Sequence, residues 1–180
     1  MLAGAADGLV TGMGGEGELV GLRLARGCRC FAAFAGEVVA GYGWLSSHAE
    51  WIGEIRLEIR PKPGEAYIWN CLTLPAQRRR GMFRAVIIRI STVLQAEGFT
   101  RLWIASGGGG AEKALSDAGF QPALLLDESR LGFAGLRVVR AIAIPGAEPG
   151  LAFAARLVVA DGGRPLRSTA LARRPAVRRH

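Results

Sequence analysis

The chain has 180 residues, half of them hydrophobic, and a formal net charge of +8 at pH 7. This length and composition suit one domain with a substantial core, and no apolar stretch is long enough to span a membrane. Residues 1–16 place no basic group ahead of an apolar run, which argues against a secretory signal. The three cysteines show no paired CxxC spacing, so reduced thiols in a cytoplasmic protein are the simplest interpretation.

Histidine is rare in this chain, with His48 and His180 its only examples. Two histidines exclude a zinc site built on several of them, and a hydrolase triad would have to use His48 alone. We therefore expect no metal site, and chemistry that relies on carboxylates, backbone amides and a reactive ligand.

Positive charge is concentrated towards the end of the chain. Residues 161–180 hold six arginines against one aspartate, with two prolines and few large apolar groups. This composition predicts a basic disordered tail, and it leaves open an arm that binds nucleic acid or an acidic partner. Residues 1–20 are rich in glycine and are expected to be poorly ordered, so residues 21–160 form the single predicted domain.

Hydrophobic periodicity and turn residues predict the elements of the first half of the chain. They are a short helix over residues 18–25 that Gly27 closes, strands over 30–35 and 38–45 joined through Gly36-Glu37, and an alternating strand over 52–60. A Pro-Lys-Pro-Gly turn at residues 61–64 then precedes a more apolar, central strand over 65–74.

The second half of the chain alternates helices and strands. Its predicted elements are a helix over 80–97 that ends at Gly98, a strand over 101–105, a loop over 107–110, a helix over 111–118 ended by Gly119, strands over 121–126 and 136–144, and a segment over 151–160 that fits a strand or a helix. The sum predicts an α/β fold, with a mixed, mostly antiparallel sheet of about six or seven strands and flanking helices.

A basic, glycine-bearing turn separates the central strand from the helix over 80–97. It contains Arg78, Arg79 and Arg80, followed by Gly81. Apolar residues in the helix follow the i, i+3, i+4, i+7 spacing of a buried face. A strand, a turn and a helix N-terminus in this order present backbone N–H groups and the positive end of a helix dipole to an anion. The turn therefore predicts a site for a phosphorylated ligand.

The residues of this turn and the order of the elements resemble the GNAT superfamily of acyl-CoA-dependent N-acyltransferases. The family's signature is Gln or Arg, two residues, Gly, one residue, and then Gly or Ala. Arg78, Gly81 and Phe83 occupy these three positions, and Pro75 stands where the family often has a proline.

Two further segments carry the resemblance. Ala118-Gly119-Phe120 is similar to the Gly-Phe pair that closes the family's second helix, and residues 36–41 resemble its early hairpin. The resemblance covers about residues 28–144. It implies a central pair of parallel strands that splay apart.

The resemblance also implies a ligand, acetyl-CoA, as the acyl donor. Backbone N–H groups from Arg79 to Phe83 would wrap its pyrophosphate. Residues 70–73 would line the thioester, with a backbone N–H near Cys71 or Leu72 polarising its carbonyl. The implied coenzyme-binding residues are Leu72, Thr73, Arg78, Arg79, Arg80, Gly81, Met82 and Phe83.

In this family an amine attacks the thioester directly, and a carboxylate takes its proton, often through water. Glu65 and Tyr67 share one face of the central strand by its period of two, and we expect them to be the catalytic residues, with Glu65 the favoured base. Glu54 and Glu58 on the adjoining strand stay open as alternatives. A structural carboxylate at a strand end is the other interpretation of each.

The chain departs from the family pattern in its second helix and in its first residues. A tyrosine usually protonates the leaving thiolate, and Leu115 stands at its position, while Gly108 stands where an asparagine often precedes this helix. The segment before the early hairpin, which normally forms much of the acceptor wall, is short.

These observations predict an N-acetyltransferase that acts on a primary amine of a small molecule or a peptide. One alternative is a catalytically weak coenzyme A-binding module, and another is a nucleic-acid-binding protein that acts through its arginine-rich tail. A homodimer stays open, and neither a membrane nor a nucleic acid is the expected partner.

Overall fold

The computed structural model describes residues 10–52, 57–107, 110–131, 136–144, 158–160 and 175–179. The chain divides into two compact units, Met1–Ser46 with Ile68–Gly98, and Ser47–Tyr67 with Phe99–His180. Strand β5 (Glu65–Thr73) contributes its first residues to the second unit and the others to the first.

The first unit combines an antiparallel hairpin with the helices that cover it. Its elements are the 3-10 helix η1 (Gly14–Leu19), α2 (Val20–Ala25), β1 (Arg29–Ala35), β2 (Val38–Ser46), the second part of β5, the 3-10 helix η2 (Pro75–Gln77) and α3 (Met82–Ala96). The strand order is β1-β2-β5, and β1 pairs with β2 through a turn at Gly36, whose φ is 63°.

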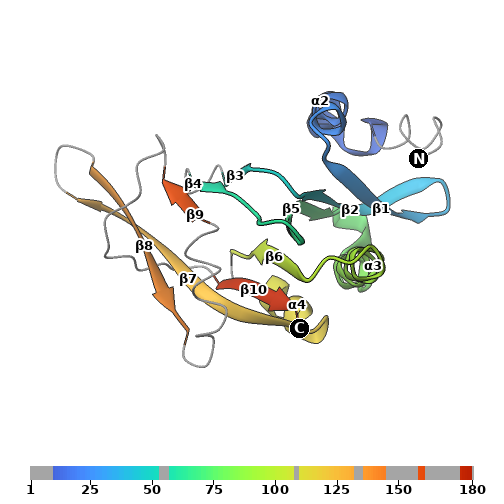
Figure 1. The fold of residues 1–180 in the computed structure, drawn as a ribbon. Coiled ribbons are helices and arrows are strands. Elements are labelled where there is room, and N and C mark those ends of the chain that lie inside the picture. Colours follow the sequence, from blue (N-terminus) through green and yellow to red (C-terminus); the bar gives the residue numbers. More distant parts are fainter. Residues whose placement is uncertain are drawn as a thin grey trace. The chain divides into compact units, whose positions relative to one another are not determined.

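Helices α2 and α3 lie on opposite sides of β1 and β2 (Figure 1). Consecutive side chains of a strand point to opposite faces, so two neighbouring residues of β2 face the two helices. A Cβ on Gly43 would lie 3.3 Å from side-chain atoms of Val86 and Ile90 in α3, whereas Trp44 packs against Arg23 of α2. The buried face of α3 consists of Val86, Ile87, Ile90, Ser91 and Leu94.

The second unit contains the other strands and helix α4. Its elements are β3 (Glu50–Ile52), β4 (Leu57–Ile59), the first part of β5, β6 (Arg101–Ala105), α4 (Gly110–Asp117), β7 (Phe120–Leu131), β8 (Leu136–Ala143), β9 (Val158–Ala160) and β10 (Pro175–Arg179). The strand order is β5-β6-β10-β7-β8 in one sheet and β3-β4-β9 in another. The N–H of Thr100 donates to the C=O of Gly64 at 2.8 Å, which ties the approach to β6 to the start of β5.

The predicted fold class is confirmed. The sheet is mostly antiparallel, its one parallel pair is β5 and β6, which are joined through α3, and helices flank it. The splaying of this pair stays a prediction. Within the described residues, no helix is both long enough and apolar enough to cross a membrane.

The alternating segment 52–60 is two strands rather than the single one predicted. Ile52 of β3 pairs with Leu57 of β4 in antiparallel register, so the chain reverses direction between them. An alternation of apolar and charged residues fits one long strand and a tight hairpin equally well, and the pattern alone cannot place the reversal.

Both ends of the chain hold elements that composition did not predict. Residues 14–19 form η1, inside the segment expected over 1–20 to be poorly ordered, of which residues 1–9 lie outside the described ones. Met13, Gly17 and Val20 are buried there at i, i+4, i+7 spacing, which gives the segment an apolar side. In the expected tail, Pro175–Arg179 forms β10 between β6 and β7. The other residues of 161–180 lie outside the described ones, and their disorder stays a prediction.

The close approach of β2 to β5 makes Gly41 sensitive to substitution. A Cβ there would lie 2.9 Å from the backbone oxygen of Leu72 and 3.4 Å from the Cα of Thr73. We expect Gly41→Ala to lower the free energy of unfolding by about 1–3 kcal/mol, the usual effect of over-packing, in urea titrations.

Gly21→Ala is the matched control for this substitution. A Cβ on Gly21 meets nothing within 4 Å, and alanine is a better helix former, so α2 should tolerate it without loss of stability. Equal losses for the two variants would contradict the close approach at Gly41.

Candidate functional site

The turn between β5 and α3 has a left-handed backbone at two positions. After η2, Arg78 is extended, Arg79 has a φ of 61° and Gly81 has a φ of 76°. Glycine adopts such angles readily, but another residue does so at a cost in free energy, and such residues cluster at functional sites. The backbone of Arg79 therefore marks this turn as a candidate site.

Backbone N–H groups are available where the turn enters the helix. Gly81 is the N-cap of α3, no side chain caps it, and the first turn carries no acidic residue. The N–H of Ala85 donates to the C=O of Gly81 at 2.9 Å, so the N–H groups of Met82, Phe83 and Arg84 precede the first bond within the helix. Free N–H groups at the positive end of a 15-residue helix are a site for an anion.

The three arginines of the turn are exposed. Arg78 Nε donates to the C=O of Thr73 at 3.4 Å, and Arg80 Nη1 donates to Gln77 Oε1 at 3.2 Å. These bonds fasten the turn to residues that precede it and leave the positive charge beside the helix N-terminus. At this candidate anion site the backbone offers the donors, and the arginines add charge.

Strand β5 leaves regular geometry shortly before the turn. Asn70 has a φ of 42°, and its Nδ2 donates to Glu16 Oε2 at 2.6 Å. The N–H of Leu74 donates to the C=O of Ala40 in β2 at 3.0 Å, which fixes the end of the strand. Thr73 Oγ1 is buried and has no hydrogen-bond partner in the part of the chain that the structure describes. The predicted coenzyme-binding residues from Leu72 to Phe83 therefore form one continuous segment of the first unit.

Cys71 lies in this segment but is not an available nucleophile. Burial raises the pKa of its thiol to about 12, so the thiol is protonated at neutral pH. The thiolate is the reactive form of cysteine, and an acyl-cysteine intermediate is therefore disfavoured.

Glu65, the predicted base, has a structural environment. Its side chain is buried, Oε1 accepts from Arg101 Nη1 and Oε2 accepts from Trp103 Nε1, both at 2.9 Å, and the N–H of Lys62 reaches Oε2 at 3.4 Å. A general base needs a lone pair directed at the proton it removes, and both oxygens of Glu65 accept bonds from the protein. These bonds hold β5 to β6 within the second unit, and the role of Glu65 as the base stays a prediction.

The other residues considered for catalysis belong to the second unit of the chain. Tyr67 is buried in the second unit, and its role stays a prediction. Glu58 pairs with Arg60, and Glu54 lies outside the described residues. Leu115, at the position of the family's acid, is completely buried in α4 and offers no proton.

Two charged residues that the sequence analysis passed over lie in the first unit. Arg23 of α2 is buried and pairs with Glu16 of η1, with 2.5 Å between Nη2 and Oε2. The hydrogen bond from Arg23 holds the pKa of Glu16 below its usual range, so Glu16 is charged at neutral pH. The signal that could have found them is the helical spacing of Glu16, Val20 and Arg23, which the glycines around them obscured.

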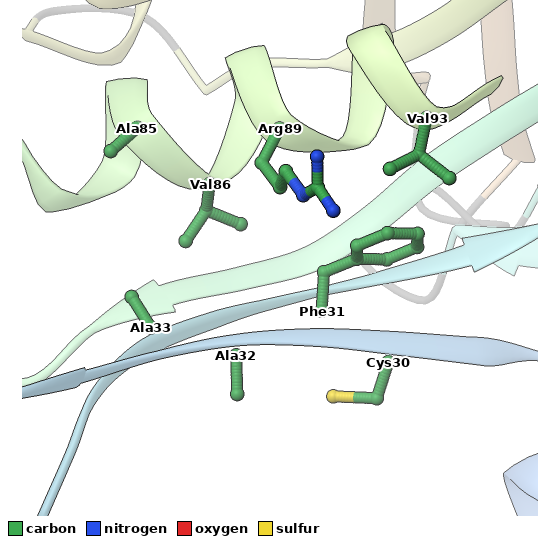
Figure 2. A pocket seen from close by; sticks show the side chains of 8 residues that line it. All are labelled: Cys30, Phe31, Ala32, Ala33, Ala85, Val86, Arg89 and Val93. Atoms are coloured by element: carbon green, nitrogen blue, oxygen red, sulfur yellow. The ribbon is translucent and has the colours of Figure 1, made fainter. Parts of the chain in front are cut away.

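A separate pocket of about 560 Å³ lies between α3 and β1. Figure 2 shows Phe31 and Ala33 pointing from β1 towards the helix, with Arg89 and Val93 of α3 above them. Its lining is apolar apart from Arg89, and none of the predicted site residues takes part in it. The pocket therefore belongs to a different part of the unit from the turn.

Comparison with known families matches the acetyltransferase (GNAT) family over residues 15–120, which is more than half of the chain. The chain belongs to this family. The match spans η1, the basic turn, α3 and α4, and it confirms the resemblance drawn from the sequence. Members are acyltransferases, so the turn lies in an acyltransferase domain.

Solved structures show the same fold at low sequence identity. A GNAT family acetyltransferase from Brucella melitensis, in complex with acetyl-CoA, is 15% identical, with a TM-score of 0.51 over 80% of this chain and 84% of that one. A putative acetyltransferase from Agrobacterium tumefaciens is 18% identical, with a TM-score of 0.50 over 74% of this chain and 94% of that one. Comparison with curated protein sequences gives no match.

The structural role of Glu65 leads to a stability prediction. Glu65→Gln removes the charge that pairs with Arg101 in a buried site, so we expect it to lower the free energy of unfolding by about 3 kcal/mol. Urea unfolding measures it. Glu97→Gln, which removes an exposed pair with Arg29, is the control and should change stability little. A Glu65→Gln variant of native stability but slow turnover would support Glu65 as the base.

Proposed function

We propose that this chain is an N-acetyltransferase that transfers the acetyl group of acetyl-CoA to a primary amine by direct attack. The observation that supports it most is the turn at Arg78–Gly81, whose left-handed residues lead into the uncapped N-terminus of α3. The Brucella melitensis protein of the same fold and family was solved with acetyl-CoA, which fits a site of this kind.

In this proposal the pyrophosphate of the coenzyme lies against the N–H groups of residues 79–83. Hydrogen bonds to a charged group contribute roughly 1.5–3 kcal/mol each, so several N–H donors are enough to anchor a coenzyme. The helix dipole and the exposed arginines add attraction that does not depend on the position of any single side chain. The backbone donors are therefore the main anchor.

The thioester then lies along β5 at residues 70–73. A backbone N–H near Cys71 or Leu72 stabilises the negative charge that develops on its carbonyl oxygen. The amine nitrogen bonds to the carbonyl carbon and the carbon–sulfur bond breaks. An acceptor that starts as an ammonium loses two protons overall, one to the leaving sulfur and one to solvent. The transfer is direct in this proposal, and burial, which raises the pKa of the Cys71 thiol to about 12, disfavours that residue as a nucleophile.

A primary amine with a pKa of about 10.4 is mostly charged at neutral pH and must lose a proton before it attacks. Both oxygens of Glu65 accept bonds from the protein, and in this proposal a water molecule rather than Glu65 carries the proton. Water serves as the acid for the thiolate too, since Leu115 replaces the usual tyrosine.

The burial of Leu115 also supports a second candidate, a coenzyme A-binding module with little catalysis. The two functions separate in one experiment, because the module binds acetyl-CoA but releases no free coenzyme A across a broad panel of amines. Turnover with any amine well above the hydrolysis rate would exclude the module.

The proposed pyrophosphate site is tested by Gly81→Glu. A Cβ on Gly81 meets nothing within 4 Å, so the space before the turn is open, and a carboxylate there would oppose a phosphate by charge and by bulk. We expect Gly81→Glu to abolish the calorimetric binding of acetyl-CoA that the native chain shows.

Gly98→Glu is the matched control at the other end of the same helix. Gly98 also has a positive φ, 85°, and open space around it, so it carries the same backbone strain. It should keep its affinity for acetyl-CoA. Unchanged affinity in Gly81→Glu, or equal loss in both variants, would reject the pyrophosphate site.

A further inference from the structure

A buried arginine lies against two tryptophans in the first unit. The guanidinium carbon of Arg23 is 5.1 Å from the ring centroid of Trp44 and 4.8 Å from that of Trp69, and the two centroids are 6.1 Å apart. Such cation–π contacts explain how the cation is held next to an apolar core that includes Val20, Val39 and Tyr42. The side chain of Arg23 is only 9% exposed.

This cluster contains more hydrogen-bond donors than acceptors. Arg23 Nη1, Trp44 Nε1 and Trp69 Nε1 are all buried, and none has a hydrogen-bond partner among the described residues. Buried polar groups are nearly always paired in native proteins, and an unpaired one loses the hydration that it has in the unfolded chain. Three N–H groups in a single cluster therefore have room for an acceptor group that the described residues do not supply.

The acceptor at the rim of the cluster is the carboxylate of Glu16. Its Oε2 accepts from Arg23 Nη2 and from Asn70 Nδ2, and its side chain remains 43% exposed. Glu16 therefore presents negative charge to solvent. The other terminal nitrogen of Arg23, Nη1, makes no hydrogen bond among the described residues. The cluster offers one negative and one positive group to a ligand.

The chemistry of these groups defines the class of ligand. A carboxylate has two oxygens and about four lone-pair sites, enough for three N–H donors, and it pairs well with a guanidinium. An ammonium is the complement of Glu16. A small molecule that carries both groups, an amino-carboxylate zwitterion, satisfies the cluster, whereas a simple amine or a simple carboxylate satisfies half of it.

The position of the cluster connects it to acetyl transfer. Asn70 bonds Glu16 and begins the stretch of residues 70–73 along which the thioester lies in the proposed function. An ammonium held at Glu16 is thus next to the backbone where its acyl donor is expected. We propose that Glu16, Arg23, Trp44 and Trp69 form the acceptor-recognition site, and that they select amines that also carry a carboxylate.

This inference rests on the proposed function for its reaction, but the binding site can be tested without it. The three donors are closed off from solvent, so a ligand has to displace the Arg23 side chain in order to reach them. Binding should therefore change the surroundings of both indole N–H groups. Each indole N–H gives its own signal in a proton–nitrogen NMR spectrum, which reads the atoms in question directly.

The experiment is a titration of the ¹⁵N-labelled full chain with glycine, glycinamide and acetate, with and without saturating coenzyme A. Glycinamide lacks the carboxylate and acetate lacks the amine. We expect glycine to shift the indole signals of Trp44 and Trp69 saturably, to leave those of Trp51 and Trp103 in place, and to bind about tenfold more tightly than either half-molecule. Trp44→Phe and Trp69→Phe assign the signals.

Trp69→Phe also tests the donor itself, since phenylalanine keeps an aromatic ring but has no N–H. It should weaken glycine binding about tenfold, as should Arg23→Lys, which keeps the charge and loses the fork of donors. Trp51→Phe, at an exposed position in the second unit, is the matched control and should bind glycine normally.

The outcomes separate this inference from the proposed function. If no probe shifts the indole signals of Trp44 and Trp69, the cluster is core packing. If acetate binds as tightly as glycine, the cluster does not recognise the amine. Either result overturns the inference. Acetyl-CoA binding, measured by calorimetry on the same sample, tests the proposed function independently. If the native chain does not bind acetyl-CoA, the proposed function is rejected, whether or not glycine binds.

Discussion

The close contact of β2 with β5 is the constraint on which the rest of the first unit depends. Gly41 leaves room for the backbone of Leu72, and the bond from Leu74 N–H to Ala40 C=O fixes the point where β5 ends. Because the strand ends there, the turn at Arg79 and Gly81 and the start of α3 follow at fixed positions. The candidate anion site is thus positioned by backbone contacts, and side-chain identity matters mainly where a Cβ would intrude.

Much of this fold could be predicted from the sequence because its local signals agree. Helix α3 has an apolar face, a glycine before it and Gly98 after it, and its predicted and observed bounds differ by one or two residues. Predictions were wrong where one pattern suits two structures. The alternation at 52–60 does not distinguish a strand from a hairpin, and β10 depends on distant partners in β6 and β7 that no local pattern could indicate.

Some residues of the candidate site could be predicted from the sequence, and others could not. The turn at Arg78–Gly81 could be predicted because strand, basic turn and helix follow one another along the chain. For Glu65, period two places the side chain on a face but does not show what it meets there, which is Arg101 and Trp103, so its role as the base stays a prediction. Arg23 was missed because its partners Trp44 and Trp69 are far away in sequence, and only the folded chain brings them together.

The contrast between satisfied and unsatisfied polar groups decides where chemistry is expected in this domain. Glu65 is buried, and both of its oxygens accept bonds from the protein. The donors around Arg23 are buried without a hydrogen-bond partner among the described residues, at a cost in stability that a bound ligand offsets, and no side chain caps the N–H groups at the start of α3. One group of donors suits a phosphate and the other a carboxylate, and residues 70–73 of β5 lie between them along the chain. A transferase that must hold a donor and an acceptor together needs two such sites, one for each substrate.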